Sequence, residues 1–127
     1  MIFEGIKVVA LEQAVAAPLC TRRLAQKGAE VIKIEREAGD FARHYDSAVK
    51  GQSAYFVWLN AGKKSVVLDL GIESDRAALG SMVGSADILV QNLKPGALEK
   101  LGFDIEDWHK VNPRLISCSI SGLSLIH

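Results

Sequence analysis

The segment Asn92–Gly102 is the first stretch whose residue types could bind a ligand. It follows a short apolar run and contains Pro95-Gly96, which predicts a strand end, a tight turn and a short helix that ends at the last glycine. A strand that turns sharply into a helix presents unpaired backbone N–H groups, which bind anions. Lys94 and Lys100 flank this turn. The pattern indicates either a phosphate-binding turn or an ordinary connection with solvated lysines.

The composition is that of a soluble globular chain. The 127 residues are 49% hydrophobic and 24% charged, and this length predicts one domain. Lys+Arg and Asp+Glu both number 15, and a net charge of zero argues against nucleic acid or an anionic membrane surface as partner. No apolar run approaches the roughly 18 residues of a membrane span, and the N-terminus lacks a secretory signal pattern. We therefore expect no membrane partner and a cytoplasmic location.

The residues that most often bind metals are scattered. Cys20 and Cys118 match no CxxC or other metal-ligand spacing, and we interpret both as buried free thiols. The three histidines, His44, His109 and His127, share no ligand spacing either. The sequence predicts no metal site.

Apolar runs alternate with helical patterns along the chain. Strands are expected at residues 6–11, 30–35, 64–70, 87–90 and 114–120, and helices at 18–28, 75–83 and 104–110. For the last helix, Asp104 is the expected N-cap and Asp107 the N3 residue. Residues 36–62 show no clear period and predict an irregular excursion that contains the apolar patch 55–59. The alternation predicts an open, mainly parallel α/β sheet with helices on both faces.

Cations gather near the carboxyl ends of the expected strands, where open α/β sheets bind ligands. The loops at those ends comprise residues 14–18, 35–36, 70–71, 92–96 and 121–122. Arg36, Arg43, Lys94 and Lys100 lie in or near them, a pattern that suits a long ligand with separate phosphates. Each cation alone is more often a solvated surface charge.

Two nucleotide-binding motifs are missing. The first turn, residues 12–17, contains no glycine and therefore no GxGxxG pyrophosphate turn. Residues 62–65 resemble the tail of a P-loop, but Val57 occupies the position of the first glycine and Lys64 that of the Ser/Thr. NAD and ATP are therefore disfavoured as ligands.

Six short motifs, taken together and in order, resemble the family III CoA-transferases over roughly residues 5 to 122. The motifs are Pro18 in its small-residue turn, Val31–Arg36 followed by Gly39-Asp40 and Arg43, Asn60–Ser65 running into 68–70, Ala86–Asn92, Pro95-Gly96 with Leu101-Gly102, and Asn112–Arg114 running into 119–122. This family includes formyl-CoA and carnitine-CoA transferases and α-methylacyl-CoA racemase.

The resemblance implies a Rossmann-like large domain that binds coenzyme A along this edge, in an enzyme whose two subunits interlock as rings. Val15 and Ala16 would line the pantetheine and thioester region, and Arg36 would face a CoA phosphate. Leu68 and residues of the segment 92–100 would contact the adenine and the nucleotide end. The full implied CoA-binding set is Val15, Ala16, Arg36, Leu68, Asn92, Leu93, Lys94, Ala97 and Lys100.

The sequence also departs from the family pattern. Val15 and Ala17 stand where members often have Gln or Gly, Gly71 and Ser121 stand where some transferases have lysine, and the family's Gly- and Pro-rich continuation does not follow Gly122. The catalytic aspartate of the transferases is expected beyond His127, so no catalytic residue is assigned here. Residues 1–127 are interpreted as the N-terminal part of the CoA-binding large domain, without the second domain and the C-terminal return segment.

Three functions remain open at this point. The first is the CoA-binding portion of a transferase that moves CoA between an acyl-CoA thioester and a carboxylic acid, inactive as the 127-residue chain alone. The second is a racemase that exchanges the α-proton of an acyl-CoA. The third is a non-catalytic CoA-binding or oligomerisation module.

Overall fold

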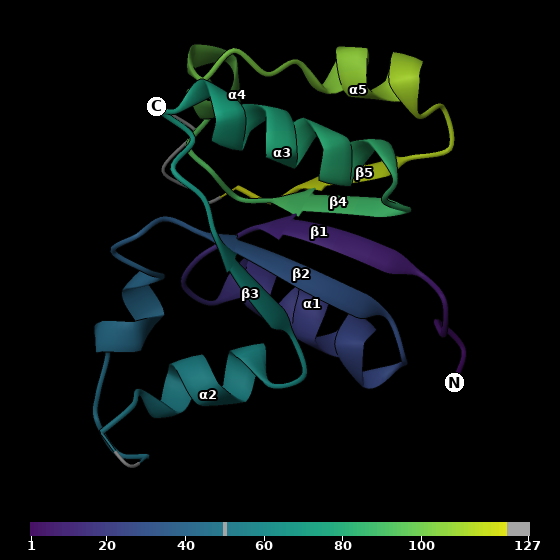
Figure 1. Cartoon of the computed structure of the whole chain (residues 1–127). Helices are drawn as coiled ribbons and strands as arrows, with labels where there is room; N and C mark the ends of the chain where they lie inside the picture. Colours follow the sequence, from purple (N-terminus) through teal and green to yellow (C-terminus); the bar gives the residue numbers. More distant parts are fainter. Residues whose placement is uncertain (50, 122–127) are drawn as a thin grey trace.

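The computed structural model describes residues 1–49 and 51–121 and contains a five-stranded sheet (Figure 1). Its strands are β1 (Lys7–Leu11), β2 (Glu30–Glu35), β3 (Lys64–Val67), β4 (Ile88–Gln91) and β5 (Ile116–Ser119). The order across the sheet is β3-β2-β1-β4-β5, and every neighbouring pair is parallel. The predicted parallel sheet is confirmed. Its order is that of the first five strands of the doubly wound fold, whose full strand order is 3-2-1-4-5-6.

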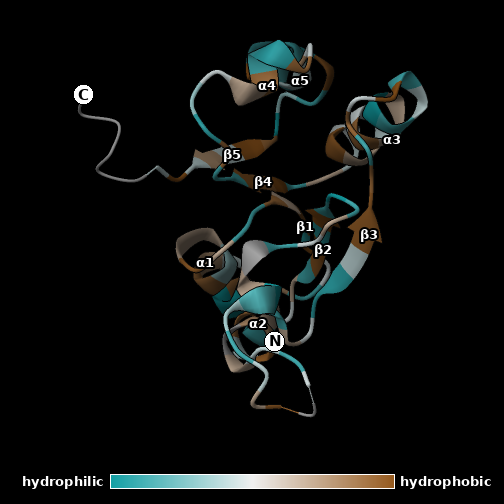
Figure 2. Ribbon diagram, turned by 90° about the vertical axis from the view of Figure 1, so that its left-hand side faces the viewer, coloured by the Kyte–Doolittle hydropathy of each residue, from teal (hydrophilic) through white to brown (hydrophobic). Residues whose placement is uncertain are grey.

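Helices cover both faces of the sheet. They are α1 (Ala16–Gln26), the 3₁₀ turn η1 (Phe41–His44), α2 (Ala54–Asn60), α3 (Glu73–Gly84), α4 (Ala97–Lys100) and α5 (Ile105–Val111). α1 and α2 lie on one side of the strands, and α3, α4 and α5 on the other (Figure 1). Figure 2 shows the same two helical layers from the side, with β4 and β5 largely in the colours of hydrophobic residues. Right-handed crossovers place helices on both faces in this way.

Successive side chains of β1 point to opposite faces of the sheet and so belong to two different hydrophobic cores. Val9 and Leu11 join the core beneath α3, α4 and α5, where Leu79 and Leu98 are buried. The alternate residues of the strand, Val8 among them, join the smaller core beneath α1. Because each face of β1 is covered, the strand is a continuous apolar run, as buried parallel strands are.

Several local predictions are confirmed. Asp104 is the N-cap of α5, and its carboxylate accepts a hydrogen bond of 2.8 Å from the Glu106 N–H. Gly96 precedes α4 with a left-handed φ of 84°, and Gly102 follows it with a φ of 88°. Glycine adopts this conformation without the steric cost that a Cβ brings.

The region 36–62 is more regular than expected. The patch predicted as irregular forms helix α2, whose N-cap Ser53 accepts a hydrogen bond of 3.3 Å from the Phe56 N–H. The aromatic and β-branched residues of α2 have modest helix propensity, so the serine cap is the better local signal. The third strand also ends earlier than predicted, at Val67, and the chain then turns at residues 69–72, where the Ile72 N–H donates to the Asp69 carbonyl at 3.0 Å.

Two smaller predictions need correction or fall outside the described residues. Cys20 and Cys118 are free but only half-buried, since one lies on α1 and the other on the edge strand β5. The expectations for the segment after Gly122 concern residues 122–127, which lie outside the described residues.

Candidate functional site

A cavity of about 460 Å³ lies at the carboxyl edge of the sheet. Its walls come from the residues at and after the ends of four strands: 11–13 after β1, 34–40 after β2, 68–70 after β3, and Leu93 after β4, with Leu101 closing one side. Of the predicted loops, 35–36, 70–71 and 92–96 contribute residues to this cavity, whereas 14–18 and Ser121 do not. This is the crevice in which open α/β sheets bind ligands.

The cavity has an apolar interior and a charged rim. Leu11, Ile34 and Leu68 belong to the buried core beneath α3 and α4, and Leu93 packs against it. Arg36 lies at the exposed rim, and its Nε donates a hydrogen bond of 3.3 Å to the Gly39 carbonyl. Ligand sites commonly combine apolar walls with a few charged groups that fix the ligand's orientation.

Asn92 and Gln13 join the loops that follow two neighbouring strands, at the point where the strand order across the sheet reverses. β1 and β4 are neighbours, and Asn92 follows β4 while Gln13 follows β1. The Gln13 N–H donates to Asn92 Oδ1 at 3.0 Å, and Asn92 Nδ2 donates to the Gln13 carbonyl at 2.8 Å. The Asn92 side chain thus fixes the loop that forms one wall of the cavity.

Ala14 has an unusual backbone conformation next to this wall. Its φ is 67°, and it is the one non-glycine residue with a positive φ among the described residues. A left-handed conformation costs an L-residue about 1–2 kcal/mol. The Ala14 N–H donates a hydrogen bond of 2.8 Å to Asp40 Oδ1, which helps to hold this conformation.

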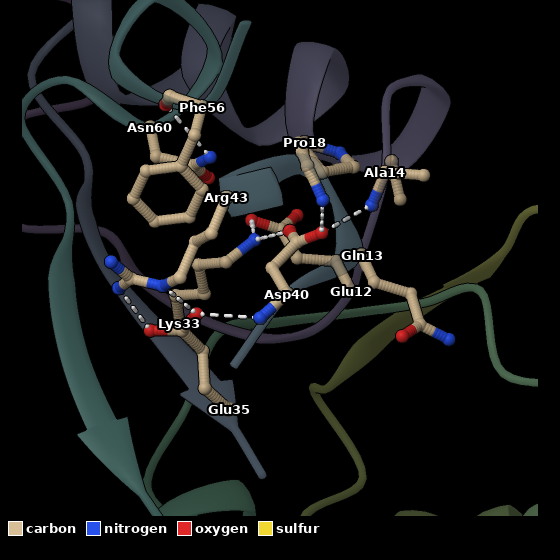
Figure 3. A network of polar contacts seen from close by, with 12 residues as sticks. Glu12, Gln13, Ala14, Pro18, Lys33, Glu35, Asp40, Arg43, Phe56 and Asn60 are labelled. Atoms are coloured by element: carbon tan, nitrogen blue, oxygen red, sulfur yellow. Dashed lines mark hydrogen bonds and ion pairs between the residues drawn. The ribbon is translucent and has the colours of Figure 1, made fainter. Parts of the chain in front are cut away.

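Four buried charged side chains lie in and beside the loop that follows β1: Glu12, Lys33, Asp40 and Lys63 (the first three are labelled in Figure 3). Lys33 Nζ lies 2.7 Å from Asp40 Oδ2, and Lys63 Nζ lies 2.6 Å from Glu12 Oε1. Burial lowers the pKa of Lys63, and the neighbouring Glu12 carboxylate opposes that shift. The two positive and two negative charges balance, as buried charges must to persist.

The cluster also binds the first turn of α1. Lys63 Nζ donates to the Pro18 carbonyl at 3.0 Å, and the Thr21 hydroxyl donates to Glu12 Oε2 at 2.6 Å. In the described part of the chain, every buried side-chain nitrogen and oxygen has a hydrogen-bond partner. A fully satisfied network of this kind stabilises one arrangement of the loops that it joins.

Glu35 and Arg43 form a second polar group beside the cavity (Figure 3). Arg43 donates from Nε to Oε1 at 2.9 Å and from Nη2 to Oε2 at 2.7 Å, and its guanidinium lies 3.9 Å from the Phe56 ring centroid. Burial alone would raise the pKa of Glu35, but hydrogen bonds from Arg43, the Ser65 hydroxyl and the Asp40 N–H lower it to about 2. Glu35 is therefore a carboxylate at neutral pH.

A second, more open cavity of about 590 Å³ lies between the start of α3 and the end of α4. Arg76 and Lys100 are the cations among its lining residues, and Phe103 forms an apolar side. The two cavities share Leu101. They therefore lie next to each other along the same edge of the sheet.

The nine residues predicted to bind CoA divide into three groups. Arg36, Leu68 and Leu93 line the first cavity, and Lys100 lines the second. The Asn92 side chain points to Gln13 and is used in holding that loop. The others line neither cavity: Val15, Ala16 and Lys94, which are exposed, and Ala97, which is half-buried.

The sequence analysis assigned no role to the buried charges that shape the site. One signal was available at Lys33, since the strand period places it on the same face as Val31, which is buried against α1. A lysine at such a position indicates a buried carboxylate partner. The identity of that partner could not be read from the strand, because Glu12 and Asp40 come from two other loops.

The described residues contain no group of three or more His, Cys, Asp or Glu side chains placed to hold a metal ion. Among them, no helix is both long and apolar enough to cross a membrane. The fold and cavity together define a parallel α/β domain with a crevice at the carboxyl edge of its sheet, where domains of this class bind their ligands.

Comparison with known proteins identifies the family. Residues 3–124 match the model of CoA-transferase family III, and the chain belongs to this family. It is 45% identical over 121 residues to an acetyl-CoA:oxalate CoA-transferase from Acetobacter aceti, a match that covers 94% of this chain and 31% of the relative. It is 40% identical over 124 residues to a succinyl-CoA:mesaconate CoA-transferase from Haloarcula hispanica, again over 94% of this chain and 31% of the relative.

The fold agrees with that of a solved structure. The crystal structure of a CAIB/BAIF family protein from Brucella suis superposes with a TM-score of 0.88 at 38% sequence identity, over 94% of this chain and 33% of that one. The chain spans about a third of the length of the relatives it matches.

Proposed function

We propose that this chain is the CoA-binding N-terminal part of a CoA-transferase that moves CoA from an acyl-CoA thioester to a carboxylic acid. Family membership supports the class of reaction, since both curated relatives above are CoA-transferases that act on carboxylic acids. The same names favour transfer over racemisation. The resemblance further supports an interlocked homodimer, with the attacking carboxylate and the second domain supplied outside residues 1–127, and we propose that this enzyme works in the cytoplasm.

The observation that carries the proposal is the first cavity. It offers apolar walls from Leu68 and Leu93 beside the Arg36 side chain, at the edge where this fold class binds ligands. Coenzyme A combines an adenine ring, which suits apolar walls, with phosphates, which suit a guanidinium. The adjoining second cavity, with Arg76 and Lys100, gives a long ligand further room and positive charge.

In the proposed pose, CoA runs along the carboxyl edge of the sheet. The adenine lies against Leu68 and Leu93, and Arg36 faces a phosphate. Lys94, Ala97 and Lys100 lie toward the nucleotide end, while Val15 and Ala16 lie beside the pantetheine arm and the thioester. The exposure of Val15 at the start of α1 leaves it available for an apolar contact.

Titration calorimetry of the 127-residue chain with coenzyme A tests the binding part of this proposal. We expect saturable one-to-one binding, because the cavity is formed by the described residues alone. Heat no greater than that of buffer dilution at millimolar CoA would contradict it.

The transfer part requires the gene product extended through the expected aspartate. We expect that extended protein to exchange CoA between acetyl-CoA and oxalate or mesaconate, and the 127-residue chain to show no turnover. Turnover by the short chain would contradict the assignment of the nucleophile to a later segment.

A further inference from the structure

The peptide bond between Gln13 and Ala14 is held at both of its ends. Its carbonyl oxygen, on Gln13, accepts a hydrogen bond of 2.8 Å from Asn92 Nδ2. Its N–H, on Ala14, donates a hydrogen bond of 2.8 Å to Asp40 Oδ1. A rotation of this peptide would break both bonds at once. The two side chains therefore fix the orientation of one peptide plane (Gln13, Ala14 and Asp40 are labelled in Figure 3).

Both holding groups are themselves fixed. Asp40 is 2% exposed, and its carboxylate also accepts from the Ala42 N–H at 2.9 Å and from Lys33 Nζ at 2.7 Å. Asn92 makes a second bond to the loop, since its Oδ1 accepts from the Gln13 N–H at 3.0 Å. A rigid acceptor on one side and a paired amide on the other leave the peptide little freedom.

This orientation keeps Ala14 in the left-handed conformation, with its φ of 67°. An L-residue released from such a constraint relaxes toward negative φ, which would move the start of α1 and the wall formed by Gln13. The constraint is thus needed because residue 14 is an alanine. Glycine would adopt the same φ without strain.

We propose that Asn92 and Asp40 are positioning residues that lock the Gln13–Ala14 peptide in the orientation that the CoA cavity requires. Asn92 then acts on the ligand through the loop after β1, rather than by contact with the ligand. This inference rests on the proposed function, because CoA is the ligand whose affinity reports the shape of the cavity. It assigns to Asn92 a role different from the direct CoA contact that the sequence resemblance implied.

A double-mutant cycle between Asn92 and Ala14 tests the lock, with CoA affinity measured by calorimetry on the 127-residue chain. Asn92→Ala is expected to weaken CoA binding about five- to tenfold, because the peptide is released and Ala14 relaxes. In the Ala14→Gly background the same change is expected to cost about twofold or less, since glycine has no strain to relieve. Such coupling distinguishes a positioning role from a direct contact.

Asn112→Ala is the matched control. The Asn112 side chain also donates to backbone carbonyls, to Ala86 at 2.7 Å and Val83 at 3.2 Å, but it lies at the end of α5 and lines neither cavity. Its replacement should lower stability and leave CoA affinity unchanged. If Asn92→Ala does not fold, Asn92→Asp takes its place, since aspartate keeps the acceptor for the Gln13 N–H and replaces the donor to the Gln13 carbonyl with a charged acceptor.

The outcomes separate the lock from the proposed function. Equal losses of CoA affinity in both backgrounds, or no loss in Asn92→Ala, would overturn the lock while leaving CoA binding intact. Absence of CoA binding by the unmodified chain would overturn the proposed function. The same double-mutant cycle, measured as free energies of unfolding in urea, then still tests whether Asn92 holds the Gln13–Ala14 peptide. That role is overturned if Asn92→Ala lowers stability equally in the Ala14 and the Ala14→Gly backgrounds.

Discussion

Gly39 leaves the space that the Arg43 side chain occupies. A Cβ on Gly39 would lie 2.9 Å from Arg43 Cδ, closer than real Cβ contacts, and 3.2 Å from its Nε, a tight contact. The Arg43 side chain must pass this close to Gly39 because, in that position, it donates two hydrogen bonds to the Glu35 carboxylate. Gly39 also has a φ of 82°, so both its backbone and its missing side chain suit the position.

Gly39→Ala should therefore destabilise the fold more than an ordinary glycine replacement at positive φ. We expect a loss of about 2–4 kcal/mol, from the left-handed strain plus the displacement of Arg43. Gly96→Ala is the matched control, since Gly96 has a φ of 84° but nothing within 4 Å of the added Cβ. Gly96→Ala should lower the free energy of unfolding only by the left-handed backbone strain, about 1–2 kcal/mol. Urea unfolding measures both, and equal losses would contradict the steric role of Gly39.

The stability that Glu35 contributes should depend on pH. Its folded pKa, about 2, lies below the ordinary value of 4.5, so the contribution is present above pH 5 and is lost as the pH falls toward 2. Glu35→Gln should cost about 1.5–3 kcal/mol at pH 7, because Arg43 loses a charged partner. The difference between the two proteins should shrink below pH 5, because the carboxyl of the unfolded wild-type chain becomes protonated there while the folded one stays charged down to about pH 2.

Urea unfolding from pH 7 to pH 2 measures this difference. Glu37→Gln is the control, because Glu37 is an exposed neighbour and its replacement should change stability little. A Glu35→Gln loss that stayed constant over the whole pH range would show that the charge of Glu35 is not what stabilises the fold.

Lys63 and Lys64 are adjacent in the sequence but should differ greatly in their effect on stability. Lys63 pairs with Glu12 where both side chains are buried, so Lys63→Met leaves that carboxylate with Lys33, at 3.5 Å, as its cation partner and should cost about 3–5 kcal/mol. Lys64 pairs with Glu30 where both side chains are exposed, and Lys64→Met should change stability by less than about 1 kcal/mol. Urea unfolding of the two variants decides this, and similar losses would refute the importance of the buried cluster.

Arg36→Ala should weaken CoA binding by about 1.5–3 kcal/mol, because a charge-assisted contact with a phosphate is lost. Calorimetry with coenzyme A gives the dissociation constant directly. Arg23→Ala is the control, since Arg23 is exposed in the last turn of α1 and lines neither cavity. An unchanged dissociation constant in Arg36→Ala would show that Arg36 is only a surface charge.

The sequence by itself predicted the parallel sheet, because its signals are local. The apolar run 30–35 and its counterparts alternate with helical patterns, and that alternation allows few topologies. It also predicted that the loops after the strands would meet, since parallel strands bring their carboxyl ends to one edge. The helix α2 was missed because its residues favour strands, and a serine cap outweighs that preference.

Only the tertiary structure decided how the site is built. Asn92 is 79 residues from Gln13 in the sequence, and Lys63 is 51 residues from Glu12, so no local pattern could pair them. Tertiary packing also separated the predicted contacts, placing Leu93 in the cavity wall while its neighbour Lys94 is exposed. The physical reason is the same in each case. A buried charge or a strained peptide is stable only beside a partner, and the fold alone determines which distant loop supplies it.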